Sequence, residues 1–286
     1  MIILDKDKCT GCGLCVEICH EHCMTFVNDT VRINYEFCST CTQCIAICPK
    51  QALSWDHVPP VAYDEARLPS PKQLDELFKE RRTIRFFKED KIDRTLLEEI
   101  VKYGIYAPTH SFSFRAIVVD EEEIIELVNK VLMRFISRLH NLLYKPKIIH
   151  SLIRRIAPAY KAEYVKAKPK LESALARGHA LGSPPVAIVF IVGDKRIPLS
   201  EASAQYILYN MNLYAQVKGV GGRNLVGNQM FLNRSKAIRK RLGLEKHERI
   251  FGTLGLGYPA VKFRNKVEGK TLPIQWNDDG ENCIEN

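Results

Sequence analysis

Apolar positions in the first sixty residues come in short runs separated by turns. Residues 24–27 and 31–34 flank the turn Asn28-Asp29, and residues 52–55 form another strand-like piece. Short runs of this kind, bounded by turn residues, are typical of β-hairpins. We therefore expect two small hairpins in this part of the chain.

Beyond residue 70 the apolar positions recur at helical spacing. Ser70 and Asp93 are favourable helix N-caps, and Pro71 suits a first helical position. The helices that they begin carry their apolar residues on one face: Leu74, Leu77, Phe78, then Leu96, Leu97, Ile100, Val101. Residues 201–217 repeat this spacing, while residues 116–120, 185–192 and 250–256 are short apolar runs typical of buried strands. The pattern predicts a mixed α/β or α+β domain of about two hundred residues.

Prolines mark the boundary between these two regions. Val58-Pro59-Pro60 opens a stretch that ends at Pro69-Ser70-Pro71, and we interpret this stretch as a linker. The predicted organisation is a small domain at residues 1–57, a linker at 58–70 and a larger domain at 71–286.

The composition is that of a globular protein, with 46% hydrophobic residues. No run of eighteen apolar residues is present, which argues against a membrane span and disfavours membrane contact. The apolar start, Met1 to Leu4, stops at Asp5 and is too short for a signal peptide. We expect a cytoplasmic protein.

Charge is distributed unevenly along the chain, whose formal net charge is +9. The first 57 residues hold four Lys/Arg and seven Asp/Glu, a net of −3, so the remainder carries +12. A basic body of this kind can bind an anionic cofactor, an acidic protein or a membrane surface. No nucleic-acid motif accompanies the charge, so we expect no nucleic-acid partner.

Nine of the ten cysteines lie between positions 9 and 48, and eight of them form two C-x2-C-x2-C-x3-C runs offset by twenty-nine residues. In such runs three closely spaced thiolates bind one [4Fe–4S] cluster, and the fourth binds the other cluster. We assign one cluster to Cys9, Cys12, Cys15 and Cys48, and the second to Cys38, Cys41, Cys44 and Cys19. A pair of zinc sites is the alternative, but zinc ligands usually come as two pairs separated by a longer gap.

The remaining cysteines and one histidine stand outside this pattern. Cys23 lies four residues after Cys19, where the other half of the repeat has Ala52, so we expect a buried structural thiol rather than a ligand. Cys283 lies in a polar tail and has no assigned role. His20 replaces the proline that follows Cys48, and it is either a solvated loop residue or a residue that tunes its cluster. Residues 3–56 as a whole resemble bacterial two-cluster ferredoxins.

Residues 71–276 resemble the FMN-dependent nitroreductase family. The resemblance rests on four motifs in order: Arg81-Arg82-Thr83-Ile84-Arg85; Ala107-Pro108-Thr109-His110-Ser111; Gly219-Val-Gly-Gly222; and Leu254-Gly-Leu-Gly-Tyr258-Pro259 with Lys262-Phe-Arg264. Together with the N-terminal module, the chain resembles ferredoxin–nitroreductase fusions. The implied fold class is α+β: a small two-cluster ferredoxin domain followed by a nitroreductase-like domain with a mixed sheet flanked by helices.

The resemblance also implies an FMN site. In the family, the positions of Arg81, Arg82, Thr83 and Arg85 hold the phosphate and ribityl chain, which suits guanidinium groups that bind phosphate bidentately. The implied site further includes Pro108, Thr109, Ser111, Gly221, Gly222, Lys262 and Arg264. A basic helix end that favours the helix dipole is the alternative interpretation of the arginines.

Two motifs depart from the family pattern. The second continues as Ser111-Phe112-Ser113-Phe114-Arg115, without the usual Asn and Gln near the flavin ring, which puts the substrate in question more than the cofactor. The third is followed by Arg223-Asn224, where the family often has Cys-Trp.

Residues 130–170 hold eleven Lys/Arg and one acid, Glu163, with apolar residues at helical spacing. Three interpretations stay open: a helical excursion packed on the domain or on a second subunit, a lid over the flavin, or a surface that touches a membrane or an acidic partner.

The predicted function is that of an iron–sulfur flavoprotein oxidoreductase that passes electrons from the clusters to FMN and on to a small organic acceptor, such as a nitro, quinone or activated double-bond compound. His110 and Tyr106, beside the expected flavin loop, are the candidate proton donors. A separate ferredoxin or NAD(P)H is the expected donor, and the family implies a homodimer with FMN at its interface. The alternatives are an electron carrier or binding protein whose second domain lacks FMN, and an enzyme that uses reduced FMN as a substrate.

Overall fold

The N-terminal module is built from two small antiparallel ladders and two short helices. The computed structural model describes residues 1–27, 30–109, 113–145, 161–179, 182–225 and 228–276. Strand β2 (Met24–Val27) pairs with β3 (Thr30–Ile33), as expected for the first hairpin, and helices α1 (Leu14–Glu17) and α2 (Gln43–Ile47) lie within the two cysteine runs.

The second predicted hairpin takes a different form. Strand β4 (Leu53–Trp55) pairs with β1 (Ile2–Leu4) from the start of the chain, so the ladder joins the two ends of the module. A short strand satisfies its backbone groups wherever a partner is available, and sequence spacing does not say which partner that is. Ile2, Met24, Val31 and Leu53 form the apolar core of the module, against which several of the cysteines pack.

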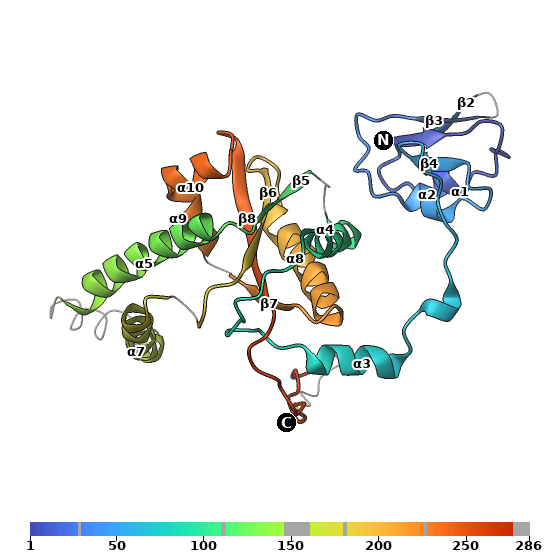
Figure 1. Ribbon diagram of the computed structural model, residues 1–286. Helices are drawn as coiled ribbons and strands as arrows, with labels where there is room; N and C mark the ends of the chain where they lie inside the picture. Colours follow the sequence, from blue (N-terminus) through green and yellow to red (C-terminus); the bar gives the residue numbers. More distant parts are fainter. Residues whose placement is uncertain (28–29, 110–112, 146–160, 180–181, 226–227, 277–286) are drawn as a thin grey trace.

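A linker and one exposed helix connect the module to the rest of the chain (Figure 1). The linker contains a short 3-10 helix, η1 (Glu65–Arg67), and ends at Ser70, which caps α3 (Pro71–Glu80). The predicted cap is present with a full capping box, since Ser70 and Gln73 bond each other's backbone N–H groups. No residue of α3 is buried, and Leu74 and Phe78 expose 38% and 46% of their surface.

The larger domain is organised around a four-stranded sheet in the order β5-β6-β8-β7. Its strands are β5 (Phe114–Val119), β6 (Ala187–Asp194), β7 (Gly221–Asn224) and β8 (Glu248–Gly257). Three of them were predicted as apolar runs, and β6 is buried along nearly its whole length. Each pairing among the described strands is antiparallel, so in this part of the chain the sheet is antiparallel rather than mixed. The α+β class is confirmed.

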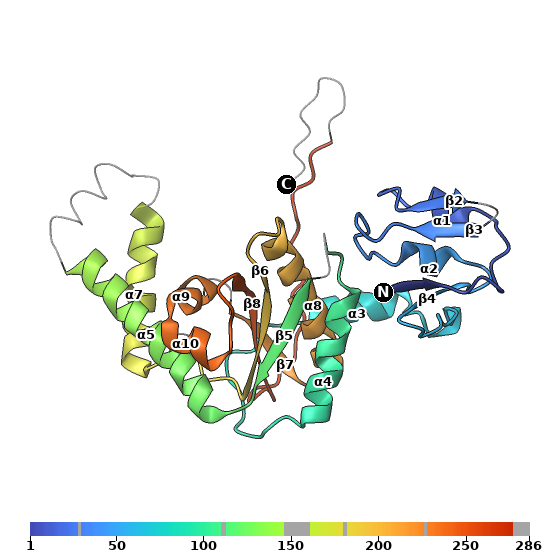
Figure 2. The ribbon, with the colours of Figure 1, turned by 90° about the horizontal axis from the view of Figure 1, so that it is seen from above.

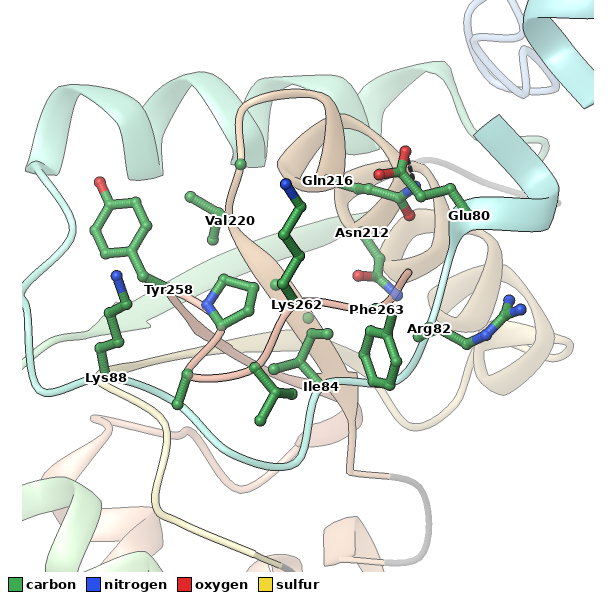
Figure 3. A pocket seen from close by; sticks show the side chains of 16 residues that line it. Glu80, Arg82, Ile84, Lys88, Asn212, Gln216, Val220, Tyr258, Lys262 and Phe263 are labelled. Carbon is green, nitrogen blue, oxygen red and sulfur yellow. Dashed lines mark hydrogen bonds between the residues drawn. The ribbon is translucent and has the colours of Figure 1, made fainter. Parts of the chain in front are cut away.

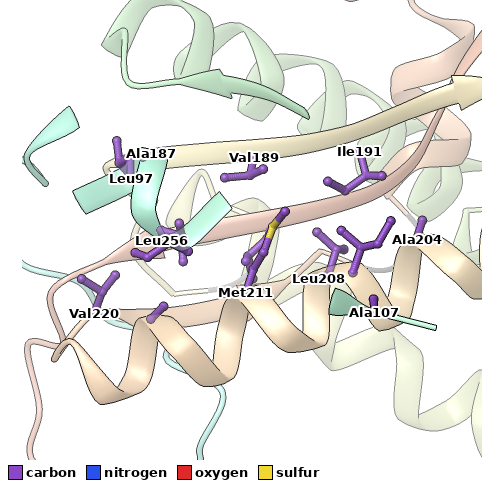
Figure 4. Packing of buried hydrophobic residues seen from close by; sticks show 14 of the residues in the cluster. Leu97, Ala107, Ala187, Val189, Ile191, Ala204, Leu208, Met211, Val220 and Leu256 are labelled. Carbon is purple, nitrogen blue, oxygen red and sulfur yellow. The ribbon is translucent and has the colours of Figure 1, made fainter. Parts of the chain in front are cut away.

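Helices cover both faces of this sheet (Figure 2). On one face α4 (Arg94–Lys102), the 3-10 helix η2 (Tyr103–Tyr106) and α8 (Ser200–Val217) pack their apolar sides. Figure 4 shows Leu208 and Met211 of α8 between this helix and the strands that carry Val189, Ile191 and Leu256. On the other face lie α5 (Glu122–Tyr144), α9 (Asn228–Arg234) and α10 (Lys236–Arg241).

The basic segment forms two helices that pack on each other. The buried residues of α5 lie in its first half, at Ile124, Ile125, Val128 and Leu132, and its second half extends beyond the sheet beside α7 (Lys161–Arg177). Residues 146–160, with part of the predicted stripe, lie outside the described residues. Among the described helices none is long and apolar enough to cross a membrane.

Candidate functional site

Two groups of four cysteines surround two small cavities in the N-terminal module. Cys9, Cys12, Cys15 and Cys48 line the first cavity. The second is lined by Cys19, Cys38, Cys41 and Cys44. We call each group of four cysteines a cage. The division is the one predicted from the spacing, because the fourth cysteine of each run belongs to the cage of the other run.

The chemistry of these groups fits clusters better than single ions. Among the described residues, no three His, Cys, Asp or Glu side chains are placed to hold one metal ion. Four thiols around a cavity suit a multi-iron cluster, whereas a structural zinc needs four ligands converging on one point. Burial raises the pKa of the Cys44 thiol to about 12 and also raises that of Cys15, so these two thiols would need the positive charge of bound iron to be thiolates at neutral pH.

Cys23 occupies the position that the repeat assigns to a small buried residue. It is 2% exposed, as is Ala52 in the other half. The backbone N–H of Cys23 donates to Cys19 Sγ at 3.3 Å, and that of Ala52 donates to Cys48 Sγ at 3.3 Å. The shared role therefore belongs to the backbone, although the Cys23 side chain does border the second cavity. Cys283 lies outside the described residues.

The larger domain has an open cavity of about 580 Å³ at the edge of its sheet (Figure 3). Three separate segments line it: the end of α3 with residues 82–88, the end of α8 with the start of β7, and residues 258–263. Its volume lies within the range of about 300–1,000 Å³ that small-molecule sites occupy.

Backbone hydrogen bonds fix the wall that residues 84–88 form. The Ile84 N–H donates to the carbonyl of Gly222 at 3.1 Å, and the Lys88 N–H donates to that of Tyr258 at 2.8 Å. In return, the Ala260 N–H donates to the Phe86 carbonyl at 2.9 Å. The motif after α3 is therefore inserted between β7 and the segment that follows β8, which brings three of the four quoted motifs together.

Glycines allow this close approach. A Cβ at Gly221 would overlap the Ile84 side chain, with its Cβ only 2.9 Å away, and would lie 3.1 Å from Pro259 Cγ. At Gly222 it would lie 2.8 Å from Asn212 Cγ. The space left by the two missing side chains lets the wall and the buried amide of Asn212 pack directly against β7.

The lining of the cavity is predominantly basic and hydrogen-bonding. Arg82, Lys88 and Lys262 contribute three cations against one carboxylate, that of Glu80, and α8 contributes the amides of Asn212 and Gln216. A cavity of this size, with cations at its edge, fits a phosphate-bearing planar ligand such as FMN.

Arg82 also fits the alternative interpretation of the arginines, in which a basic residue stabilises the end of a helix. Its Nη1 donates to the carbonyl of Lys79 at 2.7 Å and to that of Arg81 at 2.8 Å, so the guanidinium caps the end of α3. In Figure 3 its side chain stands at the edge of the group of residues.

Only some of the predicted FMN residues border the cavity in this chain. Arg82, Gly221, Gly222 and Lys262 line it. The described residues that do not are Arg81, Thr83, Arg85, Pro108, Thr109 and Arg264. Ser111 and the candidate proton donor His110 lie outside the described residues. Tyr106, the other candidate, is 76% exposed at the end of η2 and contacts Tyr103 rather than the cavity.

Arg85 lies close to Arg223 of β7 instead. Burial, and to a lesser extent the like charge of Arg85, lower the pKa of Arg223 to about 10. Arg223 is 5% exposed, donates to the Ser183 carbonyl at 3.2 Å and lies over the Phe87 ring. The pair Arg223-Asn224, where this chain departs from the family pattern, thus places a buried cation in the sheet, directly after Gly221 and Gly222.

Several lining residues were not predicted from the sequence. Lys88 follows the arginine motif, and Tyr258 was quoted as a motif residue without a role. Asn212 carried a usable signal, because it is a polar residue within the buried stripe of α8, next to Met211. A buried amide among apolar neighbours usually has a specific partner.

An ion pair holds the start of β5, which follows the second of the four motifs. Arg115 Nε and Nη2 donate to Glu248 Oε1 and Oε2 at 2.7 and 2.8 Å. The Glu248 side chain is 13% exposed, and its bond with Arg115 lowers its pKa to about 2. The bidentate pair joins the start of β5 to the start of β8, two strands that β6 separates in the sheet.

Comparison with known proteins identifies both parts of the chain. The Nitroreductase family matches residues 78–258, and a 4Fe-4S dicluster domain matches residues 1–49. An uncharacterized ferredoxin of Methanocaldococcus jannaschii is 34% identical over 68 residues, 22% of this chain and 88% of that protein. The PorD subunit of pyruvate synthase from Methanothermobacter marburgensis is 36% identical over 53 residues, 18% of this chain and 62% of the subunit.

Solved structures show the same fold for the larger domain. A nitroreductase with bound FMN from Desulfitobacterium hafniense has a TM-score of 0.50 and 16% identity, and the match covers 68% of this chain and 93% of the other. Iodotyrosine deiodinase bound to FMN and 3-iodo-L-tyrosine also has a TM-score of 0.50, with 18% identity over 72% of this chain and 99% of the other.

These matches confirm the predicted fusion, its fold class and its oxidoreductase class. The predicted cofactors, iron–sulfur clusters and FMN, agree with the two families. The chain belongs to the nitroreductase family, and a ferredoxin-type 4Fe-4S domain precedes its family domain.

Proposed function

We propose that this protein is an iron–sulfur flavoprotein reductase that holds two [4Fe–4S] clusters and FMN and reduces a small organic acceptor. One observation carries the proposal: the same chain has two four-cysteine cages and a basic cavity built from three of the nitroreductase motifs. Both structural relatives named above were solved with bound FMN, which supports the same cofactor here.

Within this proposal, Lys262 and Arg82 supply positive charge for the FMN phosphate, and Gly221 and Gly222 leave room for the ligand against β7. The amides of Asn212 and Gln216 can bond polar atoms of the ligand. When bound, the clusters supply one-electron transfer, and FMN joins one-electron to two-electron chemistry. The other family positions, Arg81, Thr83, Arg85, Pro108, Thr109, Ser111 and Arg264, stay predictions.

The acceptor is a small molecule of the nitro, quinone or activated double-bond class. The proton donor stays the one predicted from the sequence, His110 or Tyr106, on the segment after α4. A reduced external ferredoxin is the preferred donor over NAD(P)H, since one-electron cages precede the family domain in the same chain.

A homodimer belongs to the proposal. Tyr206, Tyr209, Leu213 and Val217 share one side of α8, opposite the residues that pack on the sheet, and three of them expose 53%, 39% and 65% of their surface. A core helix with a second apolar face exposed to water is favourable when another subunit covers that face. Tyr206→Glu with Val217→Glu is expected to shift the protein to monomer in analytical ultracentrifugation.

The test is a spectrum of the anaerobically purified full chain, with iron and flavin content, before and after addition of reduced ferredoxin or of NADH. The proposal expects about eight irons and one flavin per chain, both reduced faster by ferredoxin. Absence of flavin beside the cluster band would leave an electron carrier. Flavin that washes out and is broken down in air would favour an enzyme that consumes reduced FMN.

A further inference from the structure

The two cysteine cages have matching backbones. At the offset of twenty-nine residues, left-handed residues recur in pairs: Gly11 with Thr40, Gly13 with Thr42 and His22 with Gln51. The loops after the fourth cysteines close alike, because His22 N–H donates to the Cys19 carbonyl at 2.9 Å and Gln51 N–H donates to that of Cys48 at 3.1 Å.

Hydrogen bonding to the ligand sulfurs matches as well. The N–H bonds to Cys19 Sγ and to Cys48 Sγ are both 3.3 Å long. The potential of an iron–sulfur cluster depends on nearby charge, on hydrogen bonds to sulfur and on solvent exposure. Since these sulfur bonds are equal in the two halves, they do not set the two cages apart.

Side chains at the equivalent positions do differ. Lys50 and Ala52 line the first cavity, whereas Glu21 and Cys23, at the same places in the repeat, line the second. His20, in the place of Pro49, also lines the second cavity, and its Nε2 lies 3.2 Å from Glu21 Oε1. One cage thus borders a cation and the other a carboxylate.

Reduction adds one negative charge to a cluster. A neighbouring cation stabilises the reduced form and a neighbouring anion destabilises it, by Coulomb interaction over a few ångströms. Both side chains are exposed, so water and salt reduce the effect without changing its sign.

We propose that Lys50 and Glu21 separate the reduction potentials of the two clusters, so that the cluster held by Cys9, Cys12, Cys15 and Cys48 is reduced first. The inference rests on the proposed function, which supplies the two clusters. The step is the gain of one electron from a low-potential one-electron reductant, and no bond is made or broken.

The cage whose cluster is reduced first is also the one that borders the linker. A groove of about 430 Å³ lies between the α2 side of the module and linker residues 60–63, and Cys48 lines it together with Pro49 and Gln51. Lys50 therefore places the electron at the cage next to the segment that leads to the nitroreductase domain, and Glu21 disfavours its return to the other cage.

The test is an anaerobic redox titration of the full chain at one fixed pH, followed by electron paramagnetic resonance. Lys50→Gln is expected to lower the higher of the two potentials alone, with about a tenfold change in the reduced-to-oxidised ratio, or about 59 mV for one electron. Glu21→Gln is expected to raise the lower potential alone.

Two control variants remove the same charges elsewhere in the module. Arg32→Gln on β3 and Glu17→Gln on α1 alter exposed residues that border neither cavity, and they are expected to move both potentials equally and less. The exchange Glu21→Lys with Lys50→Glu keeps the net charge and is expected to reverse the order of reduction.

The outcomes separate the inference from the proposed function. Fewer than two cluster signals in the unmodified protein would refute the proposed function. Two signals whose potentials shift no more in Lys50→Gln and Glu21→Gln than in the controls would refute the inference and leave the function standing.

Discussion

Gly221 is the position where one methyl group most directly tests the cavity. In Gly221→Ala the new Cβ meets the Ile84 side chain close to its branch point and Pro259 on the other side. Because Ile84 is 6% exposed and its N–H is bonded to Gly222, it has little freedom to move aside. Overpacking of this kind costs about 1–3 kcal/mol, and about 2 kcal/mol lowers the melting temperature of a domain this size by roughly 4–8 °C.

Displacement of Ile84 also moves Lys88, which belongs to the wall, and Arg82, which lies two residues before Ile84. Since 1.4 kcal/mol corresponds to about a tenfold change in affinity, we expect FMN binding at least about tenfold weaker, measured by flavin fluorescence on the stripped protein. Gly243→Ala is the control: Gly243 has φ +60° and nothing within 4 Å of its added Cβ. It should lose about 1 kcal/mol of stability for left-handed backbone and keep its FMN affinity.

Unchanged FMN affinity in Gly221→Ala, together with a loss of stability as large as in the control or larger, would refute this reasoning. It would mean that the flavin does not use the wall formed by residues 84–88.

Three further changes test other parts of the chain. Lys262→Gln should weaken FMN binding about tenfold, most at low salt, whereas Lys266→Gln, which breaks an ion pair with α3 away from the cavity, should leave the affinity unchanged in the same titration. Cys23→Ala should keep the full iron content, because its sulfur bond is made by the backbone, while Cys19→Ala should lose one cluster by iron assay. Glu248→Gln should lose about 1–2 kcal/mol of stability at pH 7. The lowered pKa means that this contribution is complete above pH 4.5 and fades as the pH falls toward about 2, so thermal melts of variant and wild type should converge there.

The cysteine cages could be predicted almost completely from the sequence. The cysteines of each group lie within short runs, and the local backbone that brings three thiols together is fixed by a few left-handed residues such as Gly13 and Thr42. The exchange of the fourth cysteines, Cys19 and Cys48, between the two groups is expected from runs of this type. The cysteine runs did not predict the pairing partner of β4, because strand pairing at the ends of the module depends on burial rather than on spacing.

The cavity of the larger domain was predictable only in part. Its lining comes from segments nearly two hundred residues apart, and their meeting depends on the Ile84–Gly222 and Lys88–Tyr258 backbone bonds. Motif resemblance indicated which segments meet, but it could not say which side chains of a motif face the cavity. Arg82 and Lys262 do, while Arg85 lies near Arg223, in the pair Arg223-Asn224 that stands where the family often has Cys-Trp.

The cysteine cages could be predicted more completely than the cavity of the larger domain, and this difference has a physical cause. An internal repeat provides its own reference state: where two loops share their left-handed positions and their hydrogen-bond partners, a difference between their side chains becomes a difference in local energy. Equivalent positions of the two halves can be compared in this way within one chain, as for Lys50 with Glu21 and for Ala52 with Cys23. The cavity offers no such pair, so each of its residues must be judged against every neighbour at once, and the charge of Arg82 serves the end of α3 as much as any ligand.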